Sequence, residues 1–365
     1  MRRSVVCLGF AGLVALGCSG VLGDAEEPED DRPVDMDYAK VKDQPTGPSR
    51  VAPSGRRGGS LTTPRGVLRR GARQIHRPSD LEFPARPKEC VREQLVTDVL
   101  KKVANDLDQG LRTVTPLSAK EERRLGAVLH KGLLEQDRFA GKIDTRKTRA
   151  WRAYLARVAQ PLLAEVDSRD LTYEFHVIDL PEVNAFVLPG GHVYVYTGLL
   201  QNRGGAWVRN EAELAGILAH EIAHVDLGHP AAIYHYLKRL GLVGKKGEKP
   251  GAIALAMARH SFSTAQEDEA DRRSVQFMLA AQYSPAATVD LWRRWSKRLP
   301  GRPQGQRGDL ESELRNLLRS HSSPRERICT VMLATNEHKG AYPFDRWYVG
   351  KTNFRKKKAR TRRQW

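Results

Sequence analysis

The sequence predicts a helix-dominated α+β domain with a small sheet, and two observations support this fold class. Apolar residues recur at three- and four-residue spacing within residues 90–168, 211–229 and 253–281, which is the period of a buried helical face. Residues 184–196 instead join alternating Val and Tyr to a Pro-Gly-Gly turn, as a β-hairpin does. We therefore expect one domain over residues 89–340 in which helices surround a short sheet.

The first 18 residues have the layout of a secretory signal. Two arginines precede an apolar run over residues 5–17, which is too short for a stable membrane span. The run ends in Ala-Leu-Gly-Cys, which resembles a bacterial lipobox whose cysteine, Cys18, becomes lipidated. We expect a lipid-anchored protein on the periplasmic side of the cell envelope, at the outer membrane because Ser19 follows the cysteine. The alternative is cleavage further along the chain, which would give a soluble periplasmic protein.

Residues 19–88 have the composition of a disordered linker. The segment is acidic over residues 24–31 and rich in arginine over residues 50–77, and it contains Pro, Gly and Ser without apolar periodicity. We expect it to act as a tether between the anchored end and the domain.

Two helices and a strand are predicted ahead of the hairpin, each helix from one apolar stripe. The stripes consist of Val91, Leu95, Val99, Val103 and Leu107 in the first helix and of Trp151, Leu155, Val158 and Leu162 in the second. Residues 171–178 form the predicted strand. We expect these helices to pack around a third helix, over residues 211–229.

This third helix carries the motif His220-Glu221-Ile222-Ala223-His224. Asn210 is its predicted N-cap and Gly228 its predicted stop. Positions i and i+4 lie on one face of a helix, so both imidazoles can reach one metal ion. Glu221 lies about 100° around the helix from His220, where it can take a proton from a metal-bound water. This is the arrangement of an HExxH zinc metalloprotease.

A catalytic zinc site takes three protein ligands and keeps one open position, so a third ligand is required. The best candidate is Glu267, in an acidic run within the helical stretch predicted over about residues 253–281. Asp271 lies four residues further on the same helix face, where it can accept a hydrogen bond from a ligand imidazole. The alternative interpretation of this run is a solvated acidic face. We expect one Zn²⁺ per chain, held by His220, His224 and Glu267.

Four segments of the chain together resemble the gluzincin metallopeptidases of the HtpX and CaaX-prenyl-endopeptidase type, especially bacterial envelope members of the BepA and LoiP type. These segments are residues 184–200, 211–229, 263–271 and 320–328. The resemblance covers about residues 118–332. It implies a gluzincin domain with a small sheet beside the zinc helix. It also implies that Glu267 begins an E-x-x-A-D pattern as the third ligand, with Asp271 as its supporting carboxylate.

The resemblance assigns two further roles. Asn184 and Ala185 are our choice for an edge strand that faces an extended substrate. His321 and Arg327 are expected to face the zinc from the opposite wall and to stabilise the oxyanion of the tetrahedral intermediate. Two alternatives for His321 stay open, an exposed loop position and an inhibitory zinc ligand. The chain departs from the family pattern at Thr264, where an arginine is common, and at Pro324, which is displaced from its usual place after the histidine.

Histidines and cysteines outside the motif receive simpler interpretations. His229 is expected to cap the zinc helix. No role is assigned to the histidines that have no partner at metal-ligand spacing, His176, His192, His235 and His260, although His192 lies in the hairpin near the expected cleft. Cys90 and Cys329 could form a disulfide in an oxidising compartment.

Residues 341–365 are predicted to be a basic tail, because Lys and Arg recur from residue 351 onward without an acid. The tail contributes to a formal net charge of +18. It could bind anionic polymers of the envelope, or it could be a solvated tail without a partner. Nucleic acid is disfavoured as a partner of an exported protein, and no nucleic-acid-binding motif surrounds the tail.

Together these features predict a zinc-dependent metalloendopeptidase. On resemblance, its substrates are misfolded or unassembled proteins of the cell envelope. One alternative is a chaperone-like assembly factor that binds substrates in the cleft and cleaves little. Another is a structural lipoprotein with a degenerate site, which the intact ligand set disfavours.

Overall fold

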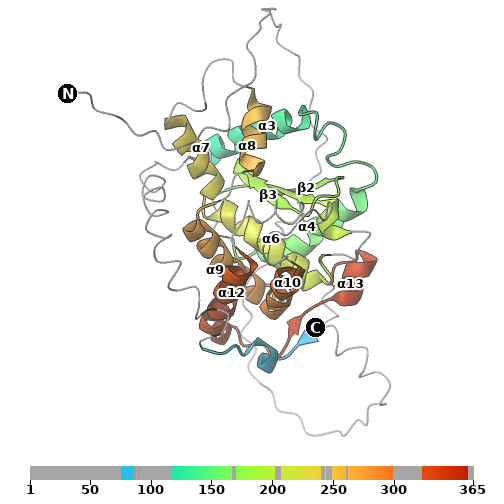
Figure 1. Ribbon diagram of the computed structural model, residues 1–365, viewed down its shortest axis with the longest axis vertical. Helices are drawn as coiled ribbons and strands as arrows, with labels where there is room; N and C mark the ends of the chain where they lie inside the picture. The colour runs from blue at the N-terminus through green and yellow to red at the C-terminus, as the bar shows by residue number, and fades with distance from the viewer. Residues whose placement is uncertain are drawn as a thin grey trace, which may run out of the picture. The chain divides into compact units, whose positions relative to one another are not determined.

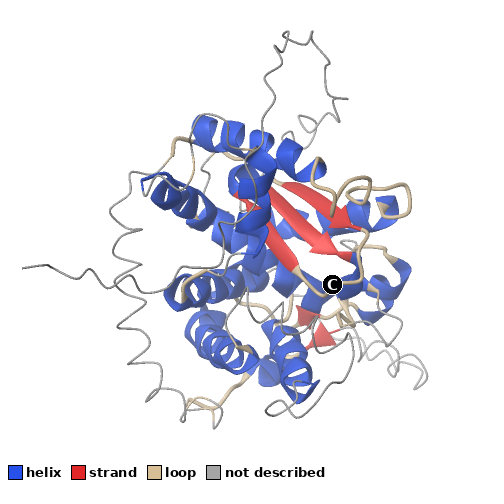
Figure 2. Ribbon diagram, turned by 45° about the horizontal axis from the view of Figure 1, so that its top comes forward, coloured by secondary structure: helices blue, strands red, loops and turns tan. Residues whose placement is uncertain are grey.

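The structure is a computed structural model that describes residues 75–85, 87, 90, 117–166, 170–201, 207–239, 243, 249–259, 262–298 and 323–360. The predicted signal, most of the predicted linker and the first predicted helical stripe lie outside these residues. His321 also lies outside them. The described residues confirm a helix-dominated fold with small sheets (Figure 1, Figure 2).

The larger sheet has three strands in the order β2-β4-β3. Strand β2 (Glu174–Ile178) runs parallel to β4 (His192–Tyr196), and β3 (Ala185–Leu188) pairs antiparallel with β4. The predicted hairpin is thereby confirmed, with Val187 opposite Val193 and a 3-10 turn η3 (Pro189–Gly191) between the strands. The second residue of this turn, Gly190, has a φ of 81°, which glycine adopts without steric cost.

Alternation along the hairpin divides the apolar side chains between two cores. Residues 185, 187, 193 and 195 face the larger core, which contains helix α6 (Glu211–Asp226). Residues 186, 188, 194 and 196 face a smaller core lined by α3 (Ala119–Leu134) and α8 (Pro250–Arg259). Both faces of the sheet are therefore covered, and Figure 2 shows its strands enclosed by helices.

Helix α6 is the predicted zinc helix, and all of its residues are buried. The Asn210 side chain accepts a hydrogen bond from Glu213 N at 2.9 Å, which confirms the predicted N-cap. Gly228, with a φ of 74°, follows the helix end.

Helix α6 packs against β3, α4 (Arg149–Leu163), α9 (Thr264–Ala280) and α10 (Pro285–Arg298), which Figure 1 shows around it. α7 (His229–Arg239) follows directly, and α12 (Pro324–His338) packs on α9 and α10.

The helix predicted over about residues 253–281 is in fact two helices. α8 ends at Arg259 and α9 begins at Thr264. Ser263 forms a capping box with Gln266, because its hydroxyl accepts from Gln266 N while the Gln266 side chain accepts from Ser263 N. This cap satisfies the first backbone donors of α9 and fixes where the helix that carries Glu267 begins.

Both ends of the described chain pack onto the domain, which corrects two predictions. Strand β1 (Ile75–His76) pairs antiparallel with β5 (Trp347–Tyr348), and the 3-10 helix η2 (Pro78–Leu81) buries Leu81 completely. The short helix α13 (Lys351–Lys356) buries Phe354. The assignments of residues 75–81 to a disordered linker and of residues 347–356 to a tail are therefore wrong. Leu81, Trp347, Tyr348 and Phe354 are buried, and Ile75 is part-buried.

The C-terminal segment closes the N-terminus of α6. Ala212 N donates to Val349 O at 3.0 Å, which satisfies one of the free amides at the helix start. The buried carboxylate of Glu211 accepts from Tyr154 Oη at 2.8 Å and from Tyr283 Oη at 3.0 Å. The Arg360 guanidinium lies 4.0 Å from the centre of the Tyr283 ring.

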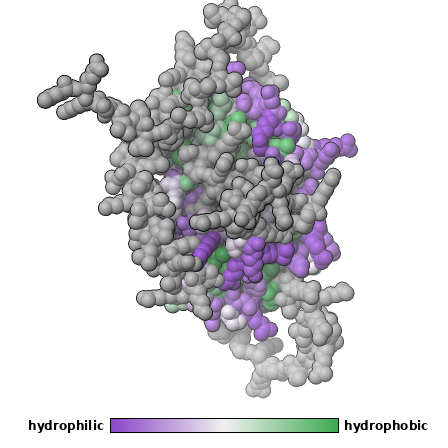
Figure 3. Space-filling view, in the orientation of Figure 1, coloured by the Kyte–Doolittle hydropathy of each residue, from purple (hydrophilic) through white to green (hydrophobic). Residues whose placement is uncertain are grey.

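Three large hydrophobic side chains of the described residues are exposed, namely Val128, Leu134 and Leu227. Most of the coloured atoms on the face in Figure 3 are hydrophilic. Among the described residues, no helix has the length and apolarity that crossing a bilayer requires.

Cys90 and Cys329 form a disulfide with their Cα atoms 5.5 Å apart, as predicted. Cys329 lies in α12, so the bond ties residue 90 to the helix that also carries Arg327. It closes a loop of 239 residues, which restricts the unfolded chain.

Tyr283→Phe should reduce the free energy of unfolding by about 1–3 kcal/mol, because the buried Glu211 carboxylate loses a hydrogen-bond donor. Urea unfolding measures this difference. Tyr342→Phe is the matched control, since Tyr342 is only part-buried, and should change stability by less than about 0.5 kcal/mol. Equal effects of the two substitutions would contradict the role given to Glu211.

A proteolytic digest without reductant should contain the Cys90 and Cys329 peptides joined, as detected by mass spectrometry. Cys329→Ser should lower the free energy of unfolding by about 2–5 kcal/mol. Alkylation of both cysteines in the unreduced, unfolded protein would show that the bond does not form.

Candidate metal centre

Helices α6 and α9 bring three potential metal ligands together. His220 Nε2 and His224 Nε2 lie 3.0 Å apart. Glu267 Oε2 lies 3.4 Å from His220 Nε2, and Glu267 Oε1 lies 3.4 Å from His224 Nε2. Donor atoms around a tetrahedral zinc ion with bonds of about 2.0–2.1 Å are separated by about 3.3 Å. Two imidazoles and a carboxylate at these distances fit a zinc ion without rearrangement of the helices.

All three side chains are almost completely inaccessible, with relative exposures of 1%, 0% and 1% for His220, His224 and Glu267. Burial of such groups costs free energy unless they are paired or ligated. The burial of Glu267 is contrary to a solvated acidic face at this residue, and the three side chains form a group that could hold a metal ion.

A carboxylate and a guanidinium support the first ligand. Asp271 Oδ1 lies 2.8 Å from His220 Nδ1, so the Nδ1 proton can face the carboxylate while Nε2 faces the metal. Arg327 donates to Asp271 from Nη2 at 2.6 Å and from Nε at 3.1 Å. The Arg327 guanidinium also lies 4.1 Å from the centre of the Trp292 ring. This packing holds Asp271 in one orientation toward His220.

A second chain of side chains supports the other ligand. His224 Nδ1 lies 2.8 Å from His229 Nδ1, and His229 Nε2 lies 3.3 Å from Glu269 Oε2. If His224 uses Nε2 for a metal, its Nδ1 carries the proton and donates to His229, which in turn donates to Glu269. The Phe262 ring stacks on His224 with ring centres 3.8 Å apart, which further limits rotation of the imidazole.

The surrounding charges act differently on the two histidines. Burial and Arg327 lower the pKa of His220, but Asp271 and Glu267 raise it, and the balance raises this pKa to about 9. Burial lowers the pKa of His224 well below its usual value, and the neighbouring His220 lowers it further. Burial raises the pKa of Asp271, yet Arg327 and His220 bring it below its ordinary value, so this carboxyl remains ionised.

Glu221 follows the first ligand and is also buried. Its carboxylate is among the charges that raise the pKa of the Arg327 guanidinium, along with Asp271 and Glu267, against the lowering caused by burial. Glu221 therefore lies within electrostatic reach of the centre, but it is not a member of the three-residue ligand group.

The model of peptidase family M48 matches residues 150–332, which include every ligand and supporting residue described above. This chain belongs to peptidase family M48. Members of this family use zinc, and the triad of His220, His224 and Glu267 could hold it.

Several relatives of this M48 chain are named as proteases. The mitochondrial metalloendopeptidase OMA1 of Schizosaccharomyces pombe is 33% identical over 149 residues, which are 39% of this chain and 43% of that protein. The beta-barrel assembly-enhancing protease of Yersinia pestis is 29% identical over 153 residues, 37% of this chain and 30% of that protein. OMA1 of Arabidopsis thaliana is 26% identical over 237 residues, 59% of this chain and 47% of that protein. The matched regions thus span less than half the length of each relative.

Three other predicted site residues, Arg327, Asn184 and Ala185, are among those that the structure describes. Arg327 is bound to Asp271, behind the His220 ligand, so the structure adds an orienting contact that was not predicted for it. Ala185 begins β3, which is an edge strand of the described three-stranded sheet, and Asn184 precedes it. The substrate contact of Asn184 and Ala185 and the oxyanion role of Arg327 stay predictions.

His229 was expected only to cap the zinc helix, and this interpretation is incomplete. It begins α7 and contacts the His224 ligand. The presence of a third histidine five residues after His224 is the sequence signal that could have indicated this contact. Phe262 offered no such signal, because a single aromatic residue between two helices does not identify what it packs against.

Asp271→Asn should weaken zinc binding by about 10–100-fold, because a neutral amide orients His220 less strongly and leaves Arg327 poorly paired. Competition with a chelating dye measures the affinity. Asp345→Asn is the charge-matched control, as the Asp345 side chain is 82% exposed, and it should leave zinc affinity unchanged. Circular dichroism verifies that both variants fold, and unaltered affinity in folded Asp271→Asn would contradict the assignment.

Proposed function

We propose that this M48 protein is a zinc-dependent metalloendopeptidase. The observation that carries the proposal is the convergence of His220, His224 and Glu267 at ligand distances beside the buried Glu221. Zinc, when bound, would lower the pKa of a water molecule and polarise the carbonyl of the scissile peptide.

Glu221 is the proposed general base and acid. Its position one residue after a ligand places its carboxylate beside the metal position rather than on it. There it would accept a proton from the attacking water and then deliver that proton to the leaving amine. Burial favours this exchange, because a carboxylate held away from bulk water interacts more strongly with the few groups around it.

Asp271 and Arg327 are proposed to position the ligands. The bidentate contact between them fixes the carboxylate that faces His220. The family resemblance also supports an oxyanion-stabilising role for His321 and Arg327. In that arrangement Arg327 would serve both the ligand carboxylate and the developing negative charge.

We further propose that the substrates are misfolded or unassembled proteins on the periplasmic side of a bacterial envelope. Supporting observations are the secretory signal and lipobox-like Cys18 in the sequence, and relatives named as beta-barrel assembly-enhancing proteases. The disulfide between Cys90 and Cys329 suits an oxidising compartment. The edge strand β3 offers backbone groups that an extended peptide could pair with.

Glu221→Gln should reduce cleavage of casein by about 10²–10⁴-fold while zinc content stays the same, because the amide cannot accept the proton from water. Glu337→Gln, at a side chain 58% exposed, is the control and should cleave at the normal rate. Zinc is measured by elemental mass spectrometry. Normal cleavage by a zinc-loaded Glu221→Gln protein would refute the proposed role.

The same variant separates proteolysis from a chaperone-like function. In cells that lack the native protein, Glu221→Gln should fail to restore degradation of accumulated envelope proteins. Full restoration by the inactive variant would show that binding, rather than cleavage, is the function.

A further inference from the structure

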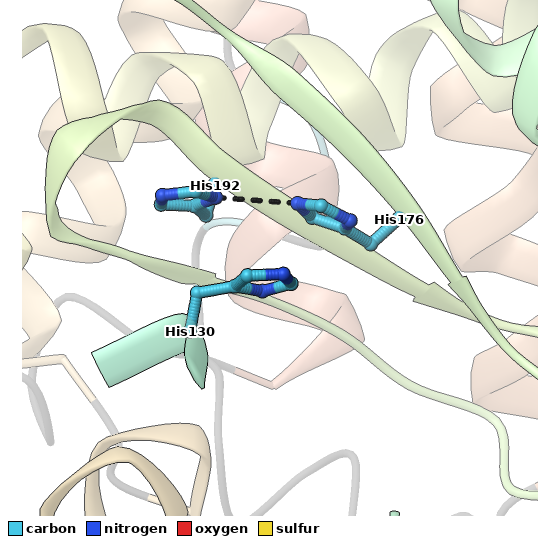
Figure 4. A group of neighbouring side chains, drawn as sticks. All are labelled: His130, His176 and His192. Carbon is cyan, nitrogen blue, oxygen red and sulfur yellow. Dashed lines mark hydrogen bonds between the residues drawn. The ribbon is translucent and has the colours of Figure 1, made fainter. Parts of the chain in front are cut away.

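A second group of three histidines lies on the opposite face of the sheet from the M48 zinc helix. His130 comes from α3, His176 from β2 and His192 from the first position of β4. Figure 4 shows the three imidazoles gathered together, with His130 facing the other two. Each offers one nitrogen, and these nitrogens all lie within 4.8 Å of one another.

The two strand histidines already have the spacing of metal ligands. His176 Nε2 lies 3.2 Å from His192 Nδ1, close to the separation of about 3.3 Å between two nitrogens on a tetrahedral zinc ion. The corresponding pair in the zinc helix, His220 and His224, is 3.0 Å apart. The His130 ring stacks on both strand histidines, with its centre 4.5 Å from that of His176 and 5.0 Å from that of His192. Imidazole nitrogens bind a metal in the plane of the ring, so His130 has to turn out of this stack before it can join the other two as a ligand.

A neighbouring carboxylate fixes the orientation of the His176 imidazole. Asp144 Oδ2 lies 2.8 Å from His176 Nδ1, and Asp144 Oδ1 accepts from Val177 N at 2.9 Å. With its Nδ1 proton donated to Asp144, His176 presents an unprotonated Nε2 toward His192. This carboxylate–histidine pair is the arrangement that supports metal-ligating histidines, as Asp271 supports His220.

His130 contacts a hydroxyl group in its stacked position. Its Nδ1 lies 2.7 Å from the Tyr194 hydroxyl, which leaves Nε2 available. Gly126, one helical turn earlier, allows α3 to approach the turn before β4, since a Cβ there would collide with the Pro189 carbonyl and lie 3.0 Å from His192 Cδ2. The close approach of the helix therefore brings His130 to the strand histidines.

An acidic side chain adds a negative charge beside the cluster. Glu174 Oε2 lies 3.8 Å from His176 Nε2 and is partly exposed, which places a negative charge beside the site.

We propose that His130, His176 and His192 form a second metal site, for a divalent transition ion of the zinc class. Three imidazoles suit Zn²⁺, Cu²⁺ or Ni²⁺ rather than Mg²⁺ or Ca²⁺, which require oxygen ligands. The ion would join α3 to β2 and β4, and thereby fasten the helix that covers the outer face of the sheet. Aromatic stacking of three neutral imidazoles in the core is the competing explanation, and it requires no ion.

The test is zinc stoichiometry of the full chain. Protein stripped with a chelator is equilibrated with Zn²⁺ alone, passed through gel filtration and measured by elemental mass spectrometry. We expect two zinc ions per native chain and one per chain in His192→Asn and in His176→Asn. His235→Asn, at a partly buried histidine of α7 outside both clusters, is the matched control and should retain two.

Thermal unfolding gives a second readout that does not depend on catalysis. Zinc should raise the unfolding temperature of the Glu221→Gln variant more than that of the double variant that carries both Glu221→Gln and His192→Asn. Circular dichroism verifies that both of these chains fold, and casein cleavage verifies that the single His192→Asn variant folds. One zinc per native chain, or two in folded His192→Asn, would overturn the second site without affecting the proposed protease function.

Discussion

Complete burial of α6 is the constraint on which the rest of the structure depends. The helix carries His220, Glu221 and His224 into the core, where uncompensated polar groups cost several kcal/mol. Neighbouring helices are therefore required to supply partners. α9 supplies Glu267 and Asp271, α12 supplies Arg327 and α7 supplies His229. The arrangement of the helices around α6 is thus also the arrangement of the site.

The site combines two different electrostatic environments within one cluster. Around His220, Asp271 and Glu267 outweigh burial and raise the pKa, whereas His224 adjoins another histidine and an aromatic ring. Arg327 stays charged because Asp271 and Glu267 offset its burial. Removal of either member of the Asp271–Arg327 pair would leave a buried charge, which makes the two residues interdependent.

Local pattern was sufficient to predict the helix of the motif and the hairpin. Asn210, the apolar spacing and the Pro-Gly-Gly turn all act within a few residues. The pairing of β1 with β5 was not predictable, since two-residue strands have no periodicity and their partners are far apart in sequence. The histidine cluster was not predictable for the same reason, because His130, His176 and His192 meet only when α3 packs on the sheet.

The C-terminal segment also determines when the site can form. Val349 and Arg360 contact the first residues of α6, and β5 pairs with a strand from the other end of the described chain. A nascent chain whose residues 347–360 are still inside the ribosome lacks these contacts. The ligands on α6 therefore reach their final environment only after this segment has left the ribosome and packed against the start of the helix.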